Sequence, residues 1–348
     1  MIPVRKAVER MKPYRPPLEG RRNFLRLDFN ENTIGCSPKV IDALRSIDAN
    51  EIATYPEYDE LKIKASKFFG VGQENILPTN ASDEGILSVF QTFLDAGSNI
   101  ILPAPTFTMF RFYAELLDLN INQLLYNNDL TFPEERFLSA ITDDIKALVV
   151  VNPNNPTGTP VKRETLIKLI EKMGNRLVLI DEAYYEFHGE TVIDLINRYK
   201  NLVVLRTFSK SFGMAGLRLG TVISCKENVA HMTKAHSPYS ISGITVKLAM
   251  AGMDDREYVE RYAAEVKINR EALRAKLEQC GLPVYPSSCN FLLIRFGGKA
   301  GKIAEAMRNE GILARDQSTS PLLEGCIRIT VGNKEQTERV FAAIKKHL

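Results

Sequence analysis

The chain has 348 residues, of which 45% are hydrophobic and 25% charged, and its formal net charge is +3. This length favours two domains, and the balanced charge argues against a nucleic acid or a membrane surface as the main partner. No segment approaches the roughly 20 apolar residues of a membrane span. The five cysteines form no CxxC pair and the four histidines no metal-ligand grouping. We therefore expect no disulfide framework, no metal, and a place in the reducing cytoplasm.

The first 30 residues predict an N-terminal arm, because the stretch MKPYRPPLEG is rich in proline, which favours extended backbone. From about Leu61, helical patterns alternate with short apolar strands. We predict helices over 86–94, 108–119 and 163–173, and strands over 99–105, 147–152, 176–184 and 201–208. Strands that are apolar throughout indicate a mostly parallel, mixed sheet with helices on both faces.

The pattern changes near Ser240. A charged helical stretch over 254–280 is followed by strands over 287–296 and 326–332 and by helices over 299–310 and from Lys334. This predicts a separate, smaller α+β domain. The expected organisation is an arm (1–30), a large three-layer α/β domain (31–240) and a small domain (241–348), with the arm packed near the small domain.

Polar clusters follow several of these strands, and sheets of this type bind ligands at the carboxyl ends of their strands. SDE (82–84) opens a helix whose free N–H groups suit an anion. NPNNPTG (152–158) forms a tight polar loop after a strand. Asp181 ends a buried strand, where a carboxylate needs a partner. Taken singly, each cluster also has a purely structural interpretation: a plain helix cap for SDE, which is favoured for that cluster alone, a surface turn for NPNNPTG and a salt bridge for Asp181.

The stretch TFSKSFGMAGLRLG (207–220) adds the remaining groups. Ser209 and Arg218 can hold a phosphate, and Lys210 can be a partly desolvated amine that forms a Schiff base. With Asn155, Asp181 and Tyr184 they supply a phosphate cradle, a carboxylate for a ring cation, a phenol–amide pair and a nucleophile. That combination is what pyridoxal phosphate requires.

The order of SDE, NPNNPTG, DEAYYEF and TFSKSFGMAGLRLG resembles the class II branch of the fold-type I pyridoxal-phosphate aminotransferases. KPY (12–14), LDFNEN (27–32), TYPEY (54–58), ILARDQ (312–317) and GCIRITVG (325–332) narrow the resemblance to the histidinol-phosphate aminotransferases. It covers nearly the whole chain. It implies the fold of that family, a homodimer, and transamination of L-histidinol phosphate with 2-oxoglutarate, giving imidazole-acetol phosphate and glutamate in histidine biosynthesis.

The resemblance also implies roles for single residues. The catalytic set is Lys210, which binds the cofactor covalently and moves a proton, with Asp181 at the ring nitrogen and Tyr184 at the ring hydroxyl. The other residues expected at the cofactor are Ser82, Asp83, Phe107, Asn155, Thr207, Ser209 and Arg218, together with Tyr55 of the partner subunit. The expected substrate-binding residues are Tyr14, Asn30, Arg315 and Arg328.

Some positions depart from the family pattern, and other functions stay open. Thr33 stands where proline is frequent, Ala81 where glycine is common and Phe107 where tyrosine is common; the last change removes a possible hydrogen bond. The alternatives are an aromatic or broad-specificity aminotransferase and a threonine-phosphate decarboxylase of the same fold. A non-catalytic regulator is disfavoured because Lys210, Asp181 and Arg218 are all present.

Overall fold

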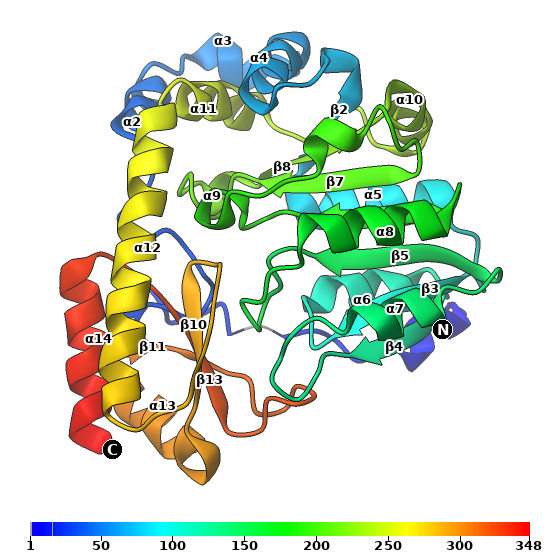
Figure 1. The fold of residues 1–348 in the computed structure, drawn as a ribbon. Coiled ribbons are helices and arrows are strands. Elements are labelled where there is room, and N and C mark those ends of the chain that lie inside the picture. Colours follow the sequence, from blue (N-terminus) through cyan, green and yellow to red (C-terminus); the bar gives the residue numbers. More distant parts are fainter. Residues whose placement is uncertain (1, 16) are drawn as a thin grey trace.

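The computed structural model describes residues 2–15 and 17–348, so residues 1 and 16 of the predicted arm lie outside it (Figure 1). Within the described chain, seven strands form one sheet of order β2-β8-β7-β6-β5-β3-β4. Strand β8 runs antiparallel to its neighbours β2 and β7, and the other pairs are parallel. The predicted mixed, mostly parallel sheet is confirmed.

The large sheet comprises β2 (Ile76–Asn80), β3 (Asn99–Ala104), β4 (Asn120–Leu125), β5 (Ile145–Val151), β6 (Leu177–Asp181), β7 (Leu202–Thr207) and β8 (Leu219–Ser224). Four of these strands match the predicted ones. The predictions did not include β2, β4 and β8, whose sequences contain proline, several amides, or glycine and threonine. Strands β2 and β4 are the two edges of the sheet, and edge strands often carry such residues because one of their sides has no neighbouring strand. This reason does not apply to β8, which lies inside the sheet.

Two hydrophobic layers cover the sheet, and the pleat of each strand divides its side chains between them. On one face, α5 (Ala81–Phe93), α6 (Thr108–Leu116) and α10 (Lys226–Ala235) pack against Leu179 and Val203. On the other face, α7 (Glu134–Ala140) and α8 (Arg163–Met173) pack against Ile180 and Val204. This alternation produces the predicted three-layer arrangement.

A second, four-stranded sheet has the order β12-β13-β10-β9 and is antiparallel. Its strands are β9 (Val284–Tyr285), β10 (Phe291–Arg295), β12 (Arg315–Asp316) and β13 (Cys326–Thr330), and its helices are α12 (Arg256–Gln279), α13 (Ala300–Asn309) and α14 (Lys334–His347). The short strand β1 (Leu25–Arg26) pairs in parallel with β11 (Ile312–Leu313). The last part of the predicted arm thus lies beside the small sheet.

The long helix α12 leads from the large sheet to the small one (Figure 1). The remaining helices are α1 (Lys6–Arg10), α2 (Pro38–Arg45), α3 (Ala49–Ala53), α4 (Asp59–Phe69), α9 (Tyr185–His188) and α11 (Gly243–Met253). Val246 and Ala249 of α11 pack with Val40 and Leu61, next to the large sheet. The domain boundary at residues 240 and 241 stays a prediction. None of the helices in the described chain is long and apolar enough to cross a membrane.

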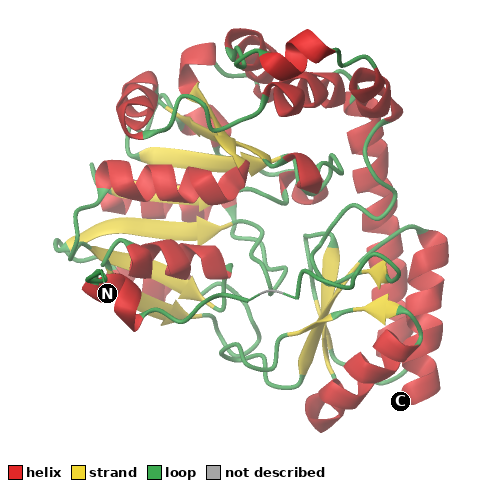
Figure 2. Ribbon diagram, turned by 180° about the vertical axis from the view of Figure 1, so that it is seen from behind, coloured by secondary structure: helices red, strands yellow, loops and turns green. Residues whose placement is uncertain are grey.

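The two sheets face each other across loops. In Figure 2 the arrowheads of the parallel strands of the large sheet point toward the small sheet. The carboxyl ends of the parallel strands therefore meet the small sheet, and this is where the sequence places its polar clusters.

Candidate active site

A cavity of about 330 Å³ lies between the two sheets, at the carboxyl ends of β5, β6 and β7. Both parts of the molecule contribute to its walls. The sequence-predicted residues that line it are Tyr14, Asn30, Ser82, Asp83, Phe107, Asn155, Asp181, Tyr184, Thr207, Ser209, Lys210, Arg218, Arg315 and Arg328. The fold therefore brings together residues that lie more than three hundred positions apart in the chain.

Asp181 is the last residue of β6 and is almost fully buried. Its Oδ1 accepts a hydrogen bond of 3.0 Å from the backbone N–H of Ala183. Burial raises the pKa of Asp181 to about 7, although this hydrogen bond acts in the opposite direction. A buried carboxylate is stable in its charged form only beside a cation. The cavity floor therefore suits a ligand with a protonated ring nitrogen.

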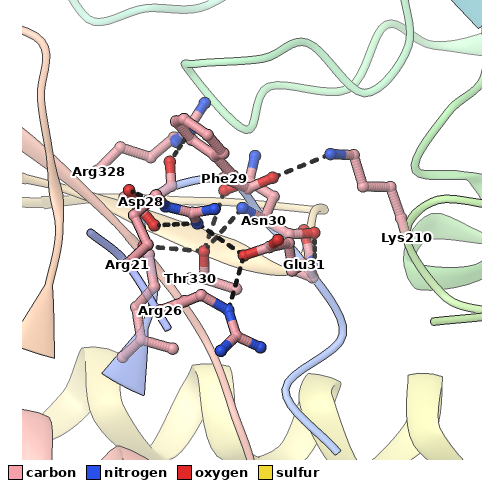
Figure 3. Close-up of polar contacts among 11 residues, drawn as sticks. Arg21, Arg26, Asp28, Phe29, Asn30, Glu31, Lys210, Arg328 and Thr330 are labelled. Atoms are coloured by element: carbon pink, nitrogen blue, oxygen red, sulfur yellow. Dashed lines mark hydrogen bonds and ion pairs between the residues drawn. The ribbon is translucent and has the colours of Figure 1, made fainter. Parts of the chain in front are cut away.

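Lys210 follows β7 and reaches across the cavity toward residues 28–31 (Figure 3). Its Nζ donates a hydrogen bond of 3.0 Å to the carbonyl oxygen of Phe29. Burial, together with the nearby guanidinium of Arg328, lowers the pKa of Lys210 to about 8. A substantial fraction of the amine is therefore neutral near physiological pH, which suits both a nucleophile and a base.

The start of α5 suits an anion. Its first turn carries Ser82 and Asp83, which line the cavity and whose N–H groups have no intrahelical acceptor. Arg218 closes the other side, and its Nη2 lies 2.8 Å from Oδ2 of Asp83. Thr207 and Ser209 line the same wall. The ion pair was not predicted, since only the backbone of Asp83 was expected to take part.

The backbone around this anion site is tight. A Cβ added at Gly220 would lie 2.5 Å from the backbone of Ala81 and Ser82, so only glycine allows α5 to approach β8 this closely. Ala81 itself has a φ of 63°, in the left-handed region. That conformation explains why glycine is common at this position in the family that the sequence resembles.

Tyr184 and Asn155 lie on the wall between the two sheets. The hydroxyl oxygen of Tyr184 accepts a hydrogen bond of 2.9 Å from Nδ2 of Asn30, so its own O–H is free to donate. Burial raises the pKa of Tyr184 well above its ordinary value, which keeps the phenol protonated. The Oδ1 of Asn155 accepts a hydrogen bond from Arg328. Phe107 precedes α6 and presents an apolar ring to the cavity.

Two arginines define the small-sheet wall. Arg315 on β12 and Arg328 on β13 are direct neighbours in the antiparallel pairing. Burial lowers the pKa of Arg328, whose Nη2 donates a hydrogen bond of 2.5 Å to the carbonyl of Asp28. Its buried Nε has no hydrogen-bond partner in the described chain. Buried donors are normally paired, so this guanidinium suits an incoming anion. Tyr14 lines the same cavity.

Tyr55 is the one predicted site residue that does not line the cavity. Its side chain is 76% exposed and packs against Tyr239, with ring centroids 4.9 Å apart. A tyrosine with this exposure is available to a neighbouring molecule. Its predicted contact with the cofactor of a second subunit stays a prediction.

Several cavity residues were missed by sequence reasoning. They include Phe29, Glu31, Gln317 and Ser320. Three of them lie inside or beside the stretches LDFNEN and ILARDQ, which we used only for their resemblance to a family. These two stretches were thus the signal that could have pointed to the missed residues, but their resemblance to a family did not indicate which side chains line the cavity.

The residues present fit pyridoxal phosphate. A buried carboxylate suits the ring nitrogen, a phenol and an amide suit the ring hydroxyl, and the start of α5 with Arg218 suits the phosphate. Lys210 lies in the same cavity with an amine that is partly neutral near physiological pH. The fit to pyridoxal phosphate thus follows from which polar groups line the cavity and from how deeply they are buried.

The family model described as "Aminotransferase class I and II" matches residues 22–344. The histidinol-phosphate aminotransferase of Symbiobacterium thermophilum is 35% identical, with 100% of this chain and 99% of that one covered. The enzyme of the same name from Caldanaerobacter subterraneus subsp. tengcongensis is 34% identical, with 93% of each chain covered.

Among solved structures, histidinol-phosphate aminotransferase from Sinorhizobium meliloti in complex with pyridoxal-5'-phosphate is similar to this chain with a TM-score of 0.89. The sequences are 24% identical, and the alignment covers 98% of this chain and 96% of that one. At this level of identity the likeness concerns the fold, and it confirms the predicted fold class.

Proposed function

The chain belongs to the class I and II aminotransferase family, and from that premise we propose that it transfers an amino group between L-histidinol phosphate and 2-oxoglutarate. The products are imidazole-acetol phosphate and glutamate, and the reaction belongs to histidine biosynthesis. The cofactor is pyridoxal 5'-phosphate. The substrate assignment is supported by relatives named histidinol-phosphate aminotransferase that align with at least 93% of the chain.

The observation that carries the substrate class is the pair of neighbouring guanidinium groups of Arg315 and Arg328 in the cavity that also holds Lys210. Two guanidinium groups can surround a phosphate dianion with several charge-assisted hydrogen bonds. The buried Nε of Arg328, which has no partner among the residues described, supplies a further donor. A phosphorylated amine would therefore place its amino group toward Lys210 and its phosphate toward β12 and β13.

The side chains of the cavity have separable tasks in this reaction. When bound, pyridoxal phosphate supplies the electron sink that stabilises negative charge at the substrate carbon. Asp181 favours the protonated ring nitrogen by its charge, and Tyr184 with Asn155 orients the ring through its hydroxyl. Lys210 anchors the cofactor and, as a free amine, removes and returns the proton at the carbon that carries the amino group. The half-reactions share one site, so ping-pong kinetics are expected.

We also propose a cytoplasmic homodimer. All five cysteines are free, which is usual where thiols are kept reduced. The exposed Tyr55 supports a second subunit, because a tyrosine with this exposure is available to a neighbouring site.

A substrate panel tests the proposed function. The purified enzyme is given 2-oxoglutarate with L-histidinol phosphate, tyrosine or phenylalanine, and glutamate formation is measured. Histidinol phosphate should react far faster than the two aromatic amino acids, and comparable rates would instead indicate a broad-specificity aminotransferase. Release of carbon dioxide from threonine phosphate would identify a decarboxylase. Lys210→Ala should remove both the activity and the visible absorbance of the bound cofactor.

A further inference from the structure

Residues 27–30 form a short strap, here named the carbonyl strap, that lies between the two sheets. Each of its four carbonyl oxygens accepts a hydrogen bond from a different residue. The carbonyl of Leu27 accepts from the N–H (2.9 Å) and Oγ1 (2.9 Å) of Thr330, and that of Asp28 accepts from Nη2 of Arg328 (2.5 Å). The carbonyl of Phe29 accepts from Nζ of Lys210 (3.0 Å), and that of Asn30 accepts from Nδ2 of Asn290 (3.0 Å). The strap is thus bonded along its whole length.

The donors come from two different parts of the molecule. Thr330 and Arg328 lie on β13, and Asn290 directly precedes β10, so three carbonyls are held by the small sheet. The fourth, that of Phe29, points the other way, toward Lys210 at the end of β7 (Figure 3). The small sheet therefore determines where the acceptor of the lysine amine lies.

A second set of contacts holds the side chains around the strap. The guanidinium of Arg21 donates to both carboxylate oxygens of Asp28, at 3.0 and 2.6 Å, and to Glu31, at 2.7 Å. It also lies 4.0 Å from the ring centroid of Phe29. Asn30 adopts a left-handed φ of 58°, and its N–H donates to Oγ1 of Thr330. Both neighbours of Phe29 are therefore fixed, which leaves its carbonyl little freedom.

We propose that the carbonyl strap positions the catalytic lysine: the Phe29 carbonyl oxygen receives the Lys210 amine whenever that amine is free, and Thr330 and Asn290 are positioning residues that aim this oxygen. The strap would hold the amine within the cavity between the two proton transfers assigned to it. The proposal goes beyond the proposed function, because it concerns the amine and not the identity of the substrate.

The charges around Lys210 determine what this acceptor does. The titratable groups that act electrostatically with the amine are Arg328 on β13, Glu31 beside the strap, Asp83 on α5, Arg218 before β8, Asp181 on β6 and the Cys289 thiol before β10. The ring of Tyr184 lies 6.0 Å from Nζ. Cations and carboxylates are both present, and burial disfavours the charged amine. A carbonyl acceptor stabilises the ammonium form more than the neutral amine, because its hydrogen bond is then charge-assisted.

The test measures the amine itself in the full-length protein freed of cofactor. Formaldehyde with cyanoborohydride methylates neutral amines, and the methylated fraction of the Lys210 peptide is followed by mass spectrometry over a pH series. Thr330→Val removes the hydroxyl that holds Leu27 and Asn30. The ammonium then loses a well-aimed acceptor, so the midpoint of Lys210 labelling should fall by about one pH unit.

Thr337→Val is the matched control. Thr337 is a buried threonine of the same part of the molecule, in α14, and its hydroxyl contacts Gly332 instead of the strap. Its midpoint should equal that of the unchanged protein. A folded Thr330→Val protein with an unshifted midpoint would overturn the proposal. If Thr330→Val does not fold, Asn290→Ala takes its place, since it removes the donor to the Asn30 carbonyl. A similar fall in the labelling midpoint would then support the proposal, and an unshifted midpoint would overturn it. The test uses no substrate, so its outcome is independent of the proposed reaction.

Discussion

Two residues of the cavity have pKa values that burial moves toward neutrality from opposite directions. The pKa of Asp181 rises to about 7 and that of Lys210 falls to about 8. In both cases removal from water disfavours the charged form. An acid and an amine that titrate this close together can both change state near physiological pH. The chemistry of the site therefore depends on how completely the fold excludes water from these two groups.

Asp181→Asn should stabilise the cofactor-free protein near pH 8. The folded-state pKa of about 7 lies above the ordinary value of 3.8, so the folded chain holds a proton that the unfolded chain has lost. Wild-type stability therefore falls as the pH rises from about 4 to about 7. Asparagine cannot ionise and avoids this loss, which is on the order of 4 kcal/mol at most for a shift of about three units.

Chemical denaturation at two pH values checks this expectation. The stabilisation by Asp181→Asn should be large near pH 8 and small near pH 4. The same substitution at Asp143, an exposed carboxylate on the surface, serves as the control and should have little effect at either pH. Equal effects of Asp181→Asn at both pH values would mean that ionisation of Asp181 does not cause the change in stability.

Arg328→Ala should weaken the reaction of a phosphorylated substrate much more than that of phenylalanine. Arg328 is buried and has an Nε that is not bonded within the described chain. Loss of a buried charge-assisted contact costs about 3 kcal/mol, which is roughly a hundredfold in kcat/KM. The measurement is kcat/KM for both substrates.

Arg295→Ala is the control for this comparison. Arg295 lies on the neighbouring strand β10, but its guanidinium binds Tyr285 and loop carbonyls and does not line the cavity. Its loss should leave the ratio between the two substrates unchanged. A similar drop for both substrates in Arg328→Ala would contradict a specific role in phosphate binding.

At the scale of elements, the anion site depends on how closely helix α5 approaches strand β8. The backbone N–H of Ala81 donates to the carbonyl of Arg218, and Gly220 pairs with Thr79 in the sheet. A Cβ at position 220 would meet the backbone of Ala81 and Ser82 at 2.5 Å. Backbone atoms cannot move aside as a flexible side chain can. The first turn of α5, which carries the cavity-lining Ser82 and Asp83, is thus held in place.

Gly220→Ala should therefore weaken cofactor binding. The added methyl group pushes the first turn of α5 away from β8 and misplaces its N–H groups. Overpacking of this kind costs about 1–3 kcal/mol, so we expect cofactor affinity to fall by roughly fivefold to a hundredfold. Titration of cofactor-free protein with pyridoxal phosphate, followed by absorbance, measures the change.

Gly216→Ala provides the comparison for this variant. A Cβ at Gly216 meets nothing within 4 Å, and the residue lies only four positions earlier. Its affinity for the cofactor should stay close to that of the unchanged protein. If Gly220→Ala binds the cofactor equally well, the close approach of α5 is not needed for the anion site.

At the scale of the whole molecule, the site is assembled from distant parts of the chain, and we expect one further residue from a second subunit. The exposed Tyr55 cannot be explained by the cavity of its own chain, which it does not line. A homodimer would place it at the neighbouring cavity. Hybrid dimers distinguish this arrangement from a role within one chain.

Mixing inactive Lys210→Ala protein with inactive or weakened Tyr55→Ala protein should restore activity. In a hybrid dimer, the site that keeps Lys210 receives an intact Tyr55 from the partner subunit. Random exchange should return about a quarter of the wild-type activity per subunit, because half of the dimers are hybrids with one complete site. An absence of recovery, with subunit exchange shown by native mass spectrometry, would place Tyr55 outside the neighbouring site.

Much of the fold could be predicted because its buried strands are continuous apolar runs. The strands β5, β6 and β7 and the helix α8 were recognised close to their observed bounds. Strand β4 was missed because half of its sequence, NINQLL, is polar and most of its residues are exposed at the edge of the sheet. The hydrophobic pattern of a sequence reflects which residues are buried, and an exposed edge strand therefore gives only a weak pattern.

The sequence by itself determined that Ser209, Lys210 and Arg218 lie close together, since they belong to one contiguous stretch. It also predicted Lys210 as the covalent anchor of the cofactor. Tertiary structure alone decided that Arg328, Asn30 and Lys210 share a cavity, because contacts between residues this far apart depend on how the two sheets pack. It also placed the Phe29 carbonyl oxygen 3.0 Å from Nζ of Lys210. Every residue carries the same carbonyl group, so no side-chain pattern can reveal which one faces the catalytic amine.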